Sequence, residues 1–168
     1  MSSTEPTLSL PTTRRPPHVT LQEVTAHSVR AITDLKVAPE QQAYVANNAV
    51  SIAQAYFHPE AWFRAICVDD EPVGFVMLED PTLLADSLGL AQIGLWRFMI
   101  DARQQGKGYG RAALRLVVEH ARSRPAQPTL RTSCVPGPHS PIAFYEKFGF
   151  RRTGEVDDGE DVLELRLR

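Results

Sequence analysis

The stretch that decides the fold is residues 93–111, Ile-Gly-Leu-Trp-Arg-Phe-Met-Ile-Asp-Ala-Arg-Gln-Gln-Gly-Lys-Gly-Tyr-Gly-Arg. Its first part, residues 93–100, is apolar apart from Arg97 and predicts a buried strand. Glycines then recur at alternate positions, and from Tyr109 to about Arg122 apolar side chains return at helical spacing. The stretch therefore predicts a strand, a glycine-rich loop and a helix, in that order.

This strand–loop–helix arrangement predicts a site for phosphate groups. Glycine allows a ligand to approach the backbone closely, and the first amides of a helix are unpaired at the positive end of its dipole. Arg103, Lys107 and Arg111 add positive charge around the same turn. The spacing G-x-G-x-G from Gly106 matches neither a Walker loop nor the dinucleotide motif G-x-G-x-x-G. A pyrophosphate is the expected ligand class, and a tight turn with solvated charges is the alternative.

The rest of the chain predicts a mixed sheet with helices on both faces. Three consecutive strands precede the glycine loop, which disfavours a purely parallel doubly wound sheet. Ser140 is expected to cap the last helix, with Pro141 at its first position. Strands are expected at residues 19–24, 63–68, 73–78, 129–135, 150–156 and 161–168, and further helices at 26–37, 40–56 and 141–148.

Length and composition indicate a single globular domain. The 168 residues are 43% hydrophobic and 23% charged, and the net charge of −2 gives no basic field for nucleic acid. No apolar run approaches the ~20 residues of a membrane helix. The two cysteines are expected to be buried small hydrophobes, which fits a reducing cytoplasm and gives no metal site. Residues 1–17, rich in Ser, Thr and Pro, are expected to be a disordered tail, or one that docks on a partner, before a domain at 18–168.

Two motifs resemble signatures of the GCN5-related N-acetyltransferase (GNAT) superfamily. Residues 100–114, Ile-Asp-Ala-Arg-Gln-Gln-Gly-Lys-Gly-Tyr-Gly-Arg-Ala-Ala-Leu, resemble its acetyl-CoA motif (Q/R)-x-x-G-x-(G/A), in registers starting at Gln105 or Arg103. Residues 143–150, Ala-Phe-Tyr-Glu-Lys-Phe-Gly-Phe, resemble its second signature. The resemblance covers residues 19–168. It implies an α/β (α+β) GNAT fold, whose mixed, mostly antiparallel central sheet of about seven strands carries helices on both faces.

Two further segments, residues 35–48 and 95–101, look like bacterial spermine/spermidine acetyltransferases. The resemblance implies transfer of an acetyl group from acetyl-CoA to a primary amine of a small molecule, without a metal. A polyamine-like acceptor is the first choice. The alternatives are another amine, such as an aminoglycoside, an amino acid or a protein N-terminus, and a non-catalytic acyl-CoA sensor. Relatives often form dimers, so a homodimer through the terminal hairpin is one expectation.

The same resemblance implies how the coenzyme binds. Backbone groups of Phe98, Met99 and Ile100 would contact the pantetheine arm, and a bulge near Met99 would free an amide to polarise the thioester carbonyl. Tyr145 matches the superfamily's tyrosine, which donates a proton to the departing thiolate; a packed tyrosine is the alternative. The pyrophosphate would lie on the glycine-rich loop, formed by Gln105, Gly106, Lys107, Gly108, Tyr109, Gly110 and Arg111.

The acceptor half of the site is less well defined by the sequence. The attacking amine must be neutral, so a general base is expected. Polyamine acetyltransferases often carry a carboxylate where this chain has Trp96 and Arg97, which should point to opposite faces of the strand. Trp96 is a candidate for the acceptor pocket, with core packing as the alternative. Glu79 and Asp80, at the end of the preceding strand, are the candidate base or amine-binding carboxylates, with solvated strand-end charges as the alternative.

Overall fold

The computed structural model describes residues 17–87 and 91–168. The expected tail, residues 1–17, lies outside the described residues except for Pro17. Within the described residues, no helix is long and apolar enough to cross a membrane.

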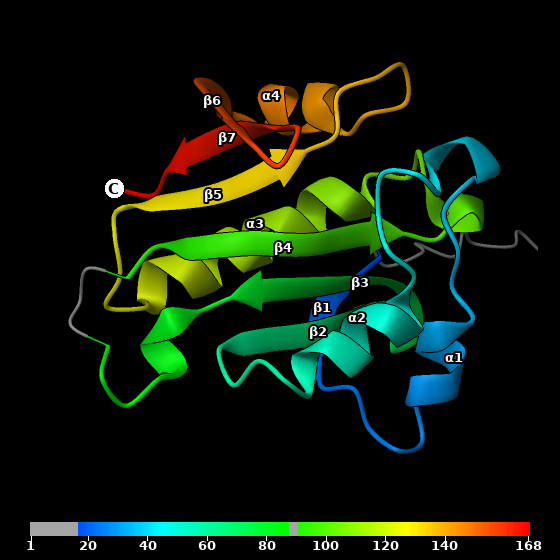
Figure 1. The fold of residues 1–168 in the computed structure, drawn as a ribbon. Coiled ribbons are helices and arrows are strands. Elements are labelled where there is room, and N and C mark those ends of the chain that lie inside the picture. Colours follow the sequence, from blue (N-terminus) through cyan, green and yellow to red (C-terminus); the bar gives the residue numbers. More distant parts are fainter. Residues whose placement is uncertain (1–16, 88–90) are drawn as a thin grey trace, which may run out of the picture.

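A seven-stranded sheet forms the centre of the molecule, in the order β1-β2-β3-β4-β5-β7-β6 (Figure 1). Every neighbouring pair is antiparallel except β4 and β5, which are parallel. The prediction of a mixed, mostly antiparallel sheet is therefore confirmed. The strands are β1 (Val19–Gln22), β2 (Ala61–Val68), β3 (Glu71–Glu79), β4 (Ile93–Ile100), β5 (Thr129–Cys134), β6 (Arg151–Asp157) and β7 (Glu160–Arg166).

Helices cover both faces of this sheet, as predicted. On β3, Phe75 and Met77 point into a core cluster that α1 and α2 cover, while Val76 and Leu78 point into a second cluster that includes α3 and α4. Because both faces are buried, β3 is a nearly continuous apolar run. The α-helices are α1 (Val29–Thr33), α2 (Asn48–Ala55), α3 (Tyr109–Ser123) and α4 (Ile142–Phe148), and short 3-10 turns lie at η1 (Pro39–Gln41), η2 (Pro81–Leu83) and η3 (Ala102–Gln104).

The helix predictions before β2 are right in position but too long. The predicted helix at 40–56 begins only with α2, because the Asn47 side chain accepts a hydrogen bond from the Val50 amide at 2.9 Å and caps that helix. At α4 the expected cap is wrong. Pro141 itself occupies the N-cap position, and no side-chain hydrogen bond from Ser140 caps the helix.

The feature of the fold that matters most for the site is the separation of β4 and β5. These strands pair only at their beginnings, where the last pair is Leu95 with Thr132. Beyond this pair β5 turns away from β4, as Figure 1 shows. The rest of β4 keeps β3 as its partner on one edge, and among residues 17–87 and 91–168 no strand pairs with its other edge.

A β-bulge lies on β4 directly after the last residue that pairs with β5. Leu95 and Arg97 pair with neighbouring residues of β3, which leaves Trp96 as the extra residue. A bulge was expected near Met99; the structure places it three residues earlier along β4.

The bulge also changes where two side chains point. Trp96 packs against the core cluster under α1 and α2, and the Arg97 guanidinium donates to Gln54 Oε1 of α2 at 3.2 Å. Both side chains therefore lie on the α2 side of the sheet. The prediction that they point to opposite faces is wrong, because an extra residue interrupts the alternation of a regular strand.

Candidate active site

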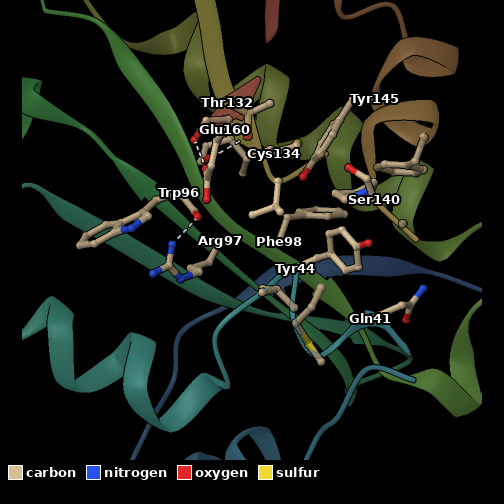
Figure 2. Close-up of a pocket in the computed structure, with 18 of the residues that line it drawn as sticks. Gln41, Tyr44, Trp96, Arg97, Phe98, Thr132, Cys134, Ser140, Tyr145 and Glu160 are labelled. Atoms are coloured by element: carbon tan, nitrogen blue, oxygen red, sulfur yellow. Dashed lines mark hydrogen bonds between the residues drawn. The ribbon is translucent and has the colours of Figure 1, made fainter. Parts of the chain in front are cut away.

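An open cleft of about 1790 Å³ lies where β4 and β5 separate (Figure 2). Its floor is the unpaired part of β4, and its upper wall is β5 with the loop that leads to α4. The β6–β7 hairpin closes one end and the glycine-rich loop the other. The lining includes residues 94–100, 104–106, 108–111, 131–135, 139–141, 155–158 and 41–46, together with Glu79, Phe144, Tyr145 and Glu160.

The glycine-rich loop has the conformation that its sequence predicts. Gly106 and Gly108 have φ of +73° and +83°, and Gly108 is the left-handed N-cap residue of α3. A Cβ at either position would meet no atom within 4 Å, so the loop presents an open surface. Gly110 lies in the first turn of α3, where a Cβ would pack at 3.5 Å from Ile100. This geometry fits a pyrophosphate group held by the first amides of α3.

Two predicted side chains of this loop support its structure. Gln105 Nε2 donates to the carbonyl oxygen of Ile100 at 2.9 Å and to Gln41 Oε1 at 2.8 Å. Lys107 does not line the cleft; its Nζ donates to Gln104 Oε1 at 2.8 Å. The surface offered to an anion is therefore mainly backbone, with Arg111 as the cleft-lining cation of α3.

Asp101 fixes this loop to the rest of the fold. Its carboxylate is 3% exposed and accepts hydrogen bonds from the Lys36 amide at 3.0 Å, the Arg103 amide at 3.0 Å and Arg103 Nε at 2.8 Å. The Arg103 guanidinium, with the Lys36 and Arg103 amides, lowers the pKa of Asp101 to about 2. The carboxylate thus joins the end of β4 to the segment after α1.

We expect Asp101→Asn to lower the free energy of unfolding by about 1–2 kcal/mol at neutral pH. Because folding depresses this pKa, the stabilisation is present above the ordinary carboxyl value of 3.8 and is lost as the pH falls through about 2. Urea unfolding at several pH values measures it. Asp34→Asn, at an exposed carboxylate, is the control. If Asp101→Asn were as stable as wild type, the Asp101 carboxylate would not stabilise the fold by joining β4 to the segment after α1.

Tyr145 enters the cleft from the first turns of α4 and is only 4% exposed. Its ring packs edge-on against Phe144 and Phe150 at 5.3 and 5.2 Å. Burial raises the pKa of the phenol well above its ordinary value, Cys134 adds to this rise, and a hydrogen bond with the Thr132 side chain opposes it. The hydroxyl therefore stays protonated and can serve as a proton donor.

Two neighbours of Tyr145 are Thr132, which the sequence did not single out, and Cys134, which was expected only to be a buried small hydrophobe. Thr132 Oγ1 donates to the Leu95 carbonyl oxygen at 3.0 Å, across the last pair before the strands separate. Burial raises the pKa of the Cys134 thiol to about 12, which keeps it from being a competing nucleophile. Only the fold places these two side chains beside the phenol.

The other predicted coenzyme contacts also lie in the cleft. Phe98, Met99 and Ile100 form its floor on the unpaired part of β4. The Phe98 ring stacks on Phe144 of α4 at 6.0 Å, and Met99 Sδ receives a weak hydrogen bond from Asn48 Nδ2 at 3.7 Å.

Residues before α2 cross over the cleft. The side-chain amides of Gln41 and Gln105 pair with each other, and the Tyr44 hydroxyl accepts a hydrogen bond from the His139 amide at 3.5 Å. A Cβ on Gly137 would collide with that hydroxyl, so glycine is required there. This crossing could not be predicted from the sequence, because it depends on contacts between distant segments.

Of the two candidate carboxylates, the structure brings only Glu79 to the cleft. Asp80 is fully buried and is not among the lining residues. Its carboxylate lies 3.1 Å from Arg124 Nε and 3.8 Å from His120 Nε2, and it accepts a hydrogen bond from the Thr82 amide. Asp80 is thus a structural ion-pair partner at the α3 side of the sheet. Glu79 is the last residue of β3, whereas Asp80 lies beyond the strand and caps η2, which explains the difference.

The end of the cleft opposite the glycine-rich loop carries charges of both signs. Trp96 and Arg97 line it from β4, and the carboxylates of the β6–β7 hairpin line it from the other side. Of these, Glu155 is already paired with Arg131. In the described part of the chain, no three or more His, Cys, Asp or Glu side chains are grouped to hold a metal ion. The hairpin carboxylates that line the cleft are Glu155, Asp157, Asp158 and Glu160.

Comparisons with known proteins agree with this geometry. The sequence profile of the Acetyltransferase (GNAT) family matches residues 25–150. The chain is 28% identical over 154 residues to the spermine/spermidine N(1)-acetyltransferase of Bacillus subtilis strain 168, covering 89% of this chain and 99% of that relative. It is 36% identical over 106 residues to the peptidyl-lysine N-acetyltransferase YjaB of Salmonella typhimurium strain LT2, covering 61% and 60%. The crystal structure of aminoglycoside acetyltransferase AAC(6')-Ib with coenzyme A superposes with a TM-score of 0.69 at 21% identity, covering 89% and 95%.

Proposed function

Because the chain belongs to the GNAT acetyltransferase family, we propose that it transfers the acetyl group of acetyl-CoA to a primary amine of a small molecule, with a polyamine as the preferred acceptor. The observation that carries this proposal is the cleft between the separated strands β4 and β5, with the glycine-rich loop at one end and the buried Tyr145 phenol on its wall.

The cleft residues fit acetyl-CoA at three places. The left-handed glycines before α3 leave an open surface for the pyrophosphate, with Arg111 beside it. The unpaired edge of β4, from Phe98 to Ile100, offers backbone groups to the amides of the pantetheine arm. The acetyl group then lies near Tyr145, where a β4 amide can stabilise the negative charge that develops on the thioester oxygen.

Tyr145 supplies the proton that the reaction needs on sulfur. The attacking nitrogen forms a bond to the acetyl carbon, the carbon–sulfur bond breaks, and the thiolate takes up a proton. The buried Tyr145 hydroxyl keeps its proton because its pKa is raised by burial. It is therefore the donor in this proposal, while the acceptor nitrogen loses its own proton to a base or to water.

The choice of acceptor rests on the relatives and on the charges of the cleft. The relative from Bacillus subtilis is named for spermine and spermidine. Asp157, Asp158, Glu160 and Glu79 line the end of the cleft opposite the glycine-rich loop, where they can hold the remaining ammonium groups of a polyamine. The two buried free cysteines, Cys67 and Cys134, support a cytoplasmic location for this reaction. A homodimer stays a prediction.

The experiment that tests the proposal is a thiol-release assay with acetyl-CoA and a panel of amines. The panel contains spermidine, spermine, an aminoglycoside, free lysine and a lysine-containing peptide. We expect release that depends on the amine and is fastest with spermidine or spermine. Equal rates across the panel would contradict the polyamine acceptor, and no amine-dependent release would contradict the proposed reaction.

The two neighbouring carboxylates should respond differently to neutralisation. We expect Glu79→Gln to lower kcat/KM for the amine by about tenfold or more at neutral pH, since Glu79 faces the cleft and can accept a proton. Asp80→Asn should leave the pH–rate profile unchanged and lower the unfolding midpoint, because it removes the charge that faces Arg124 and His120. If Glu79→Gln kept the wild-type kcat/KM and Asp80→Asn changed the pH–rate profile, Glu79 would not be the base.

A further inference from the structure

Arg97 places a fixed positive charge in the acceptor end of the cleft. Its side chain is half-buried on the bulged part of β4, and Figure 2 shows it beside Trp96 below the gap between the strands. Its guanidinium donates to the Trp96 carbonyl oxygen at 2.9 Å and to Gln54 Oε1 at 3.2 Å, while its buried Nε has no hydrogen-bond acceptor. No carboxylate of residues 17–87 or 91–168 forms an ion pair with it.

The charged groups that face Arg97 act on it from a distance, and none of those in residues 17–87 and 91–168 forms an ion pair with it. Glu160 of β7 is the carboxylate whose charge acts on it, and burial outweighs that charge in lowering the pKa of Arg97. Glu79 of β3 lines the same cleft but is exposed to water, so its field is screened. His58, which follows α2, packs on Trp96 at 5.1 Å. A guanidinium keeps its proton in proteins, so Arg97 stays charged throughout the pH range of the reaction.

From this placement we propose that Arg97 is an electrostatic residue of the acetyl transfer, which keeps the attacking amine neutral by repelling its ammonium form. The inference rests on the proposed function. An alkyl amine has a pKa of about 10.4, so only about one molecule in 10³ is neutral at pH 7. A like charge several ångströms away in a partly buried site lowers such a pKa by about one unit. The reactive population then rises about tenfold, without a proton being transferred to or from Arg97.

The hydrogen bonds of Arg97 favour this electrostatic role over a role in binding the carboxylate of an acidic acceptor. An arginine that binds a carboxylate offers two parallel N–H groups to it. Here each terminal nitrogen already donates one hydrogen bond to a protein oxygen, and the third nitrogen is buried. These bonds hold the guanidinium to Trp96 and Gln54, and its charge acts on the cleft. A polyamine is compatible with this arrangement, because its distal ammonium groups reach the hairpin carboxylates while its reacting nitrogen lies near Arg97.

The test is the pH dependence of kcat at saturating spermidine in wild type, Arg97→Lys, Arg97→Gln and Arg97→Met, because kcat reports the pKa of the bound amine. Lysine keeps the charge, glutamine keeps a polar group and methionine keeps the apolar stem that packs beside Trp96. Arg152→Gln is the control, because Arg152 is an exposed arginine outside the cleft that pairs with Glu146 and Asp161. Thermal unfolding of each variant is measured alongside.

We expect both neutral variants to shift the rising limb of the profile upward by about one pH unit. They should lose about tenfold in kcat at neutral pH and recover most of it at alkaline pH. Arg97→Lys and Arg152→Gln should follow wild type. A loss in the neutral variants that is the same at every pH would overturn the proposal and indicate a structural role. Faster acetylation of amines bearing a carboxylate by wild type, lost in both neutral variants, would overturn it in favour of an anion site.

The proposed function can fail separately. If wild type releases no thiol with any amine, the reaction itself is wrong and the inference falls with it. If wild type is active and the rising limb of the pH profile does not move in Arg97→Gln or Arg97→Met, only the proposed role of Arg97 is wrong.

Discussion

Tyr145→Phe should lower kcat by a factor of about 10²–10³, which is the range expected for loss of a positioned proton donor. The change removes one oxygen atom and keeps the ring that packs against Phe144 and Phe150. The fold and the binding of CoA should therefore stay the same. Because burial holds the pKa of this phenol above its ordinary value, wild type should show no decline in kcat from Tyr145 up to that ordinary value of 10.0.

Steady-state kinetics and calorimetric titration with CoA measure these two effects separately. Tyr56→Phe is the matched control, since Tyr56 is 85% exposed and lies outside the cleft. Wild-type turnover in Tyr145→Phe would remove the phenol from the mechanism. A loss of CoA affinity equal to the loss of kcat would assign it to binding.

Gly108→Val should weaken CoA binding by about tenfold or more, which corresponds to about 1.4 kcal/mol. Gly108 has φ of +83° at the N-cap of α3, and a β-branched residue adopts this region only with strain of about 1–3 kcal/mol. The loop is expected to relax into another conformation, so that the first amides of α3 no longer converge on the pyrophosphate. A Cβ at this position meets no neighbouring atom, so the backbone conformation is the cause of the effect.

Gly159→Val is the matched control for this substitution. Gly159 has φ of +82° in the turn of the β6–β7 hairpin, and a Cβ there is equally free of contacts. Both variants should lose similar stability, while only Gly108→Val should lose affinity for CoA. If titration finds wild-type affinity in a folded Gly108→Val, the glycine-rich loop is not the phosphate site.

The sequence predicted the strand–loop–helix unit well because its signals are local. Apolar residues at 93–100, alternating glycines and the helical spacing after Tyr109 each act within a few residues, and the structure follows them closely. The second motif placed Tyr145 on a helix, although the sequence could not show how deeply that residue is buried.

What the sequence could not predict depends on contacts between distant segments. The bulge at Trp96 depends on pairing with β3, and it turns Trp96 and Arg97 to the same side. Residues between α1 and α2 leave the helical conformation where they meet the glycine-rich loop and the loop before α4, through Gln41 and Tyr44. The different placement of Glu79 and Asp80 also depends on such contacts, because Asp80 lies just beyond β3 and its carboxylate faces Arg124 and His120.

The most direct test of the proposed reaction follows the acetyl group itself. Acetyl-CoA labelled with ¹³C in the acetyl group is incubated with the protein and spermidine, and mass spectrometry locates the label. We predict that wild type moves the label onto a nitrogen of spermidine and that Tyr145→Phe does so far more slowly. Label that stays on CoA, or that appears only as free acetate, would contradict acetyl transfer to a small amine.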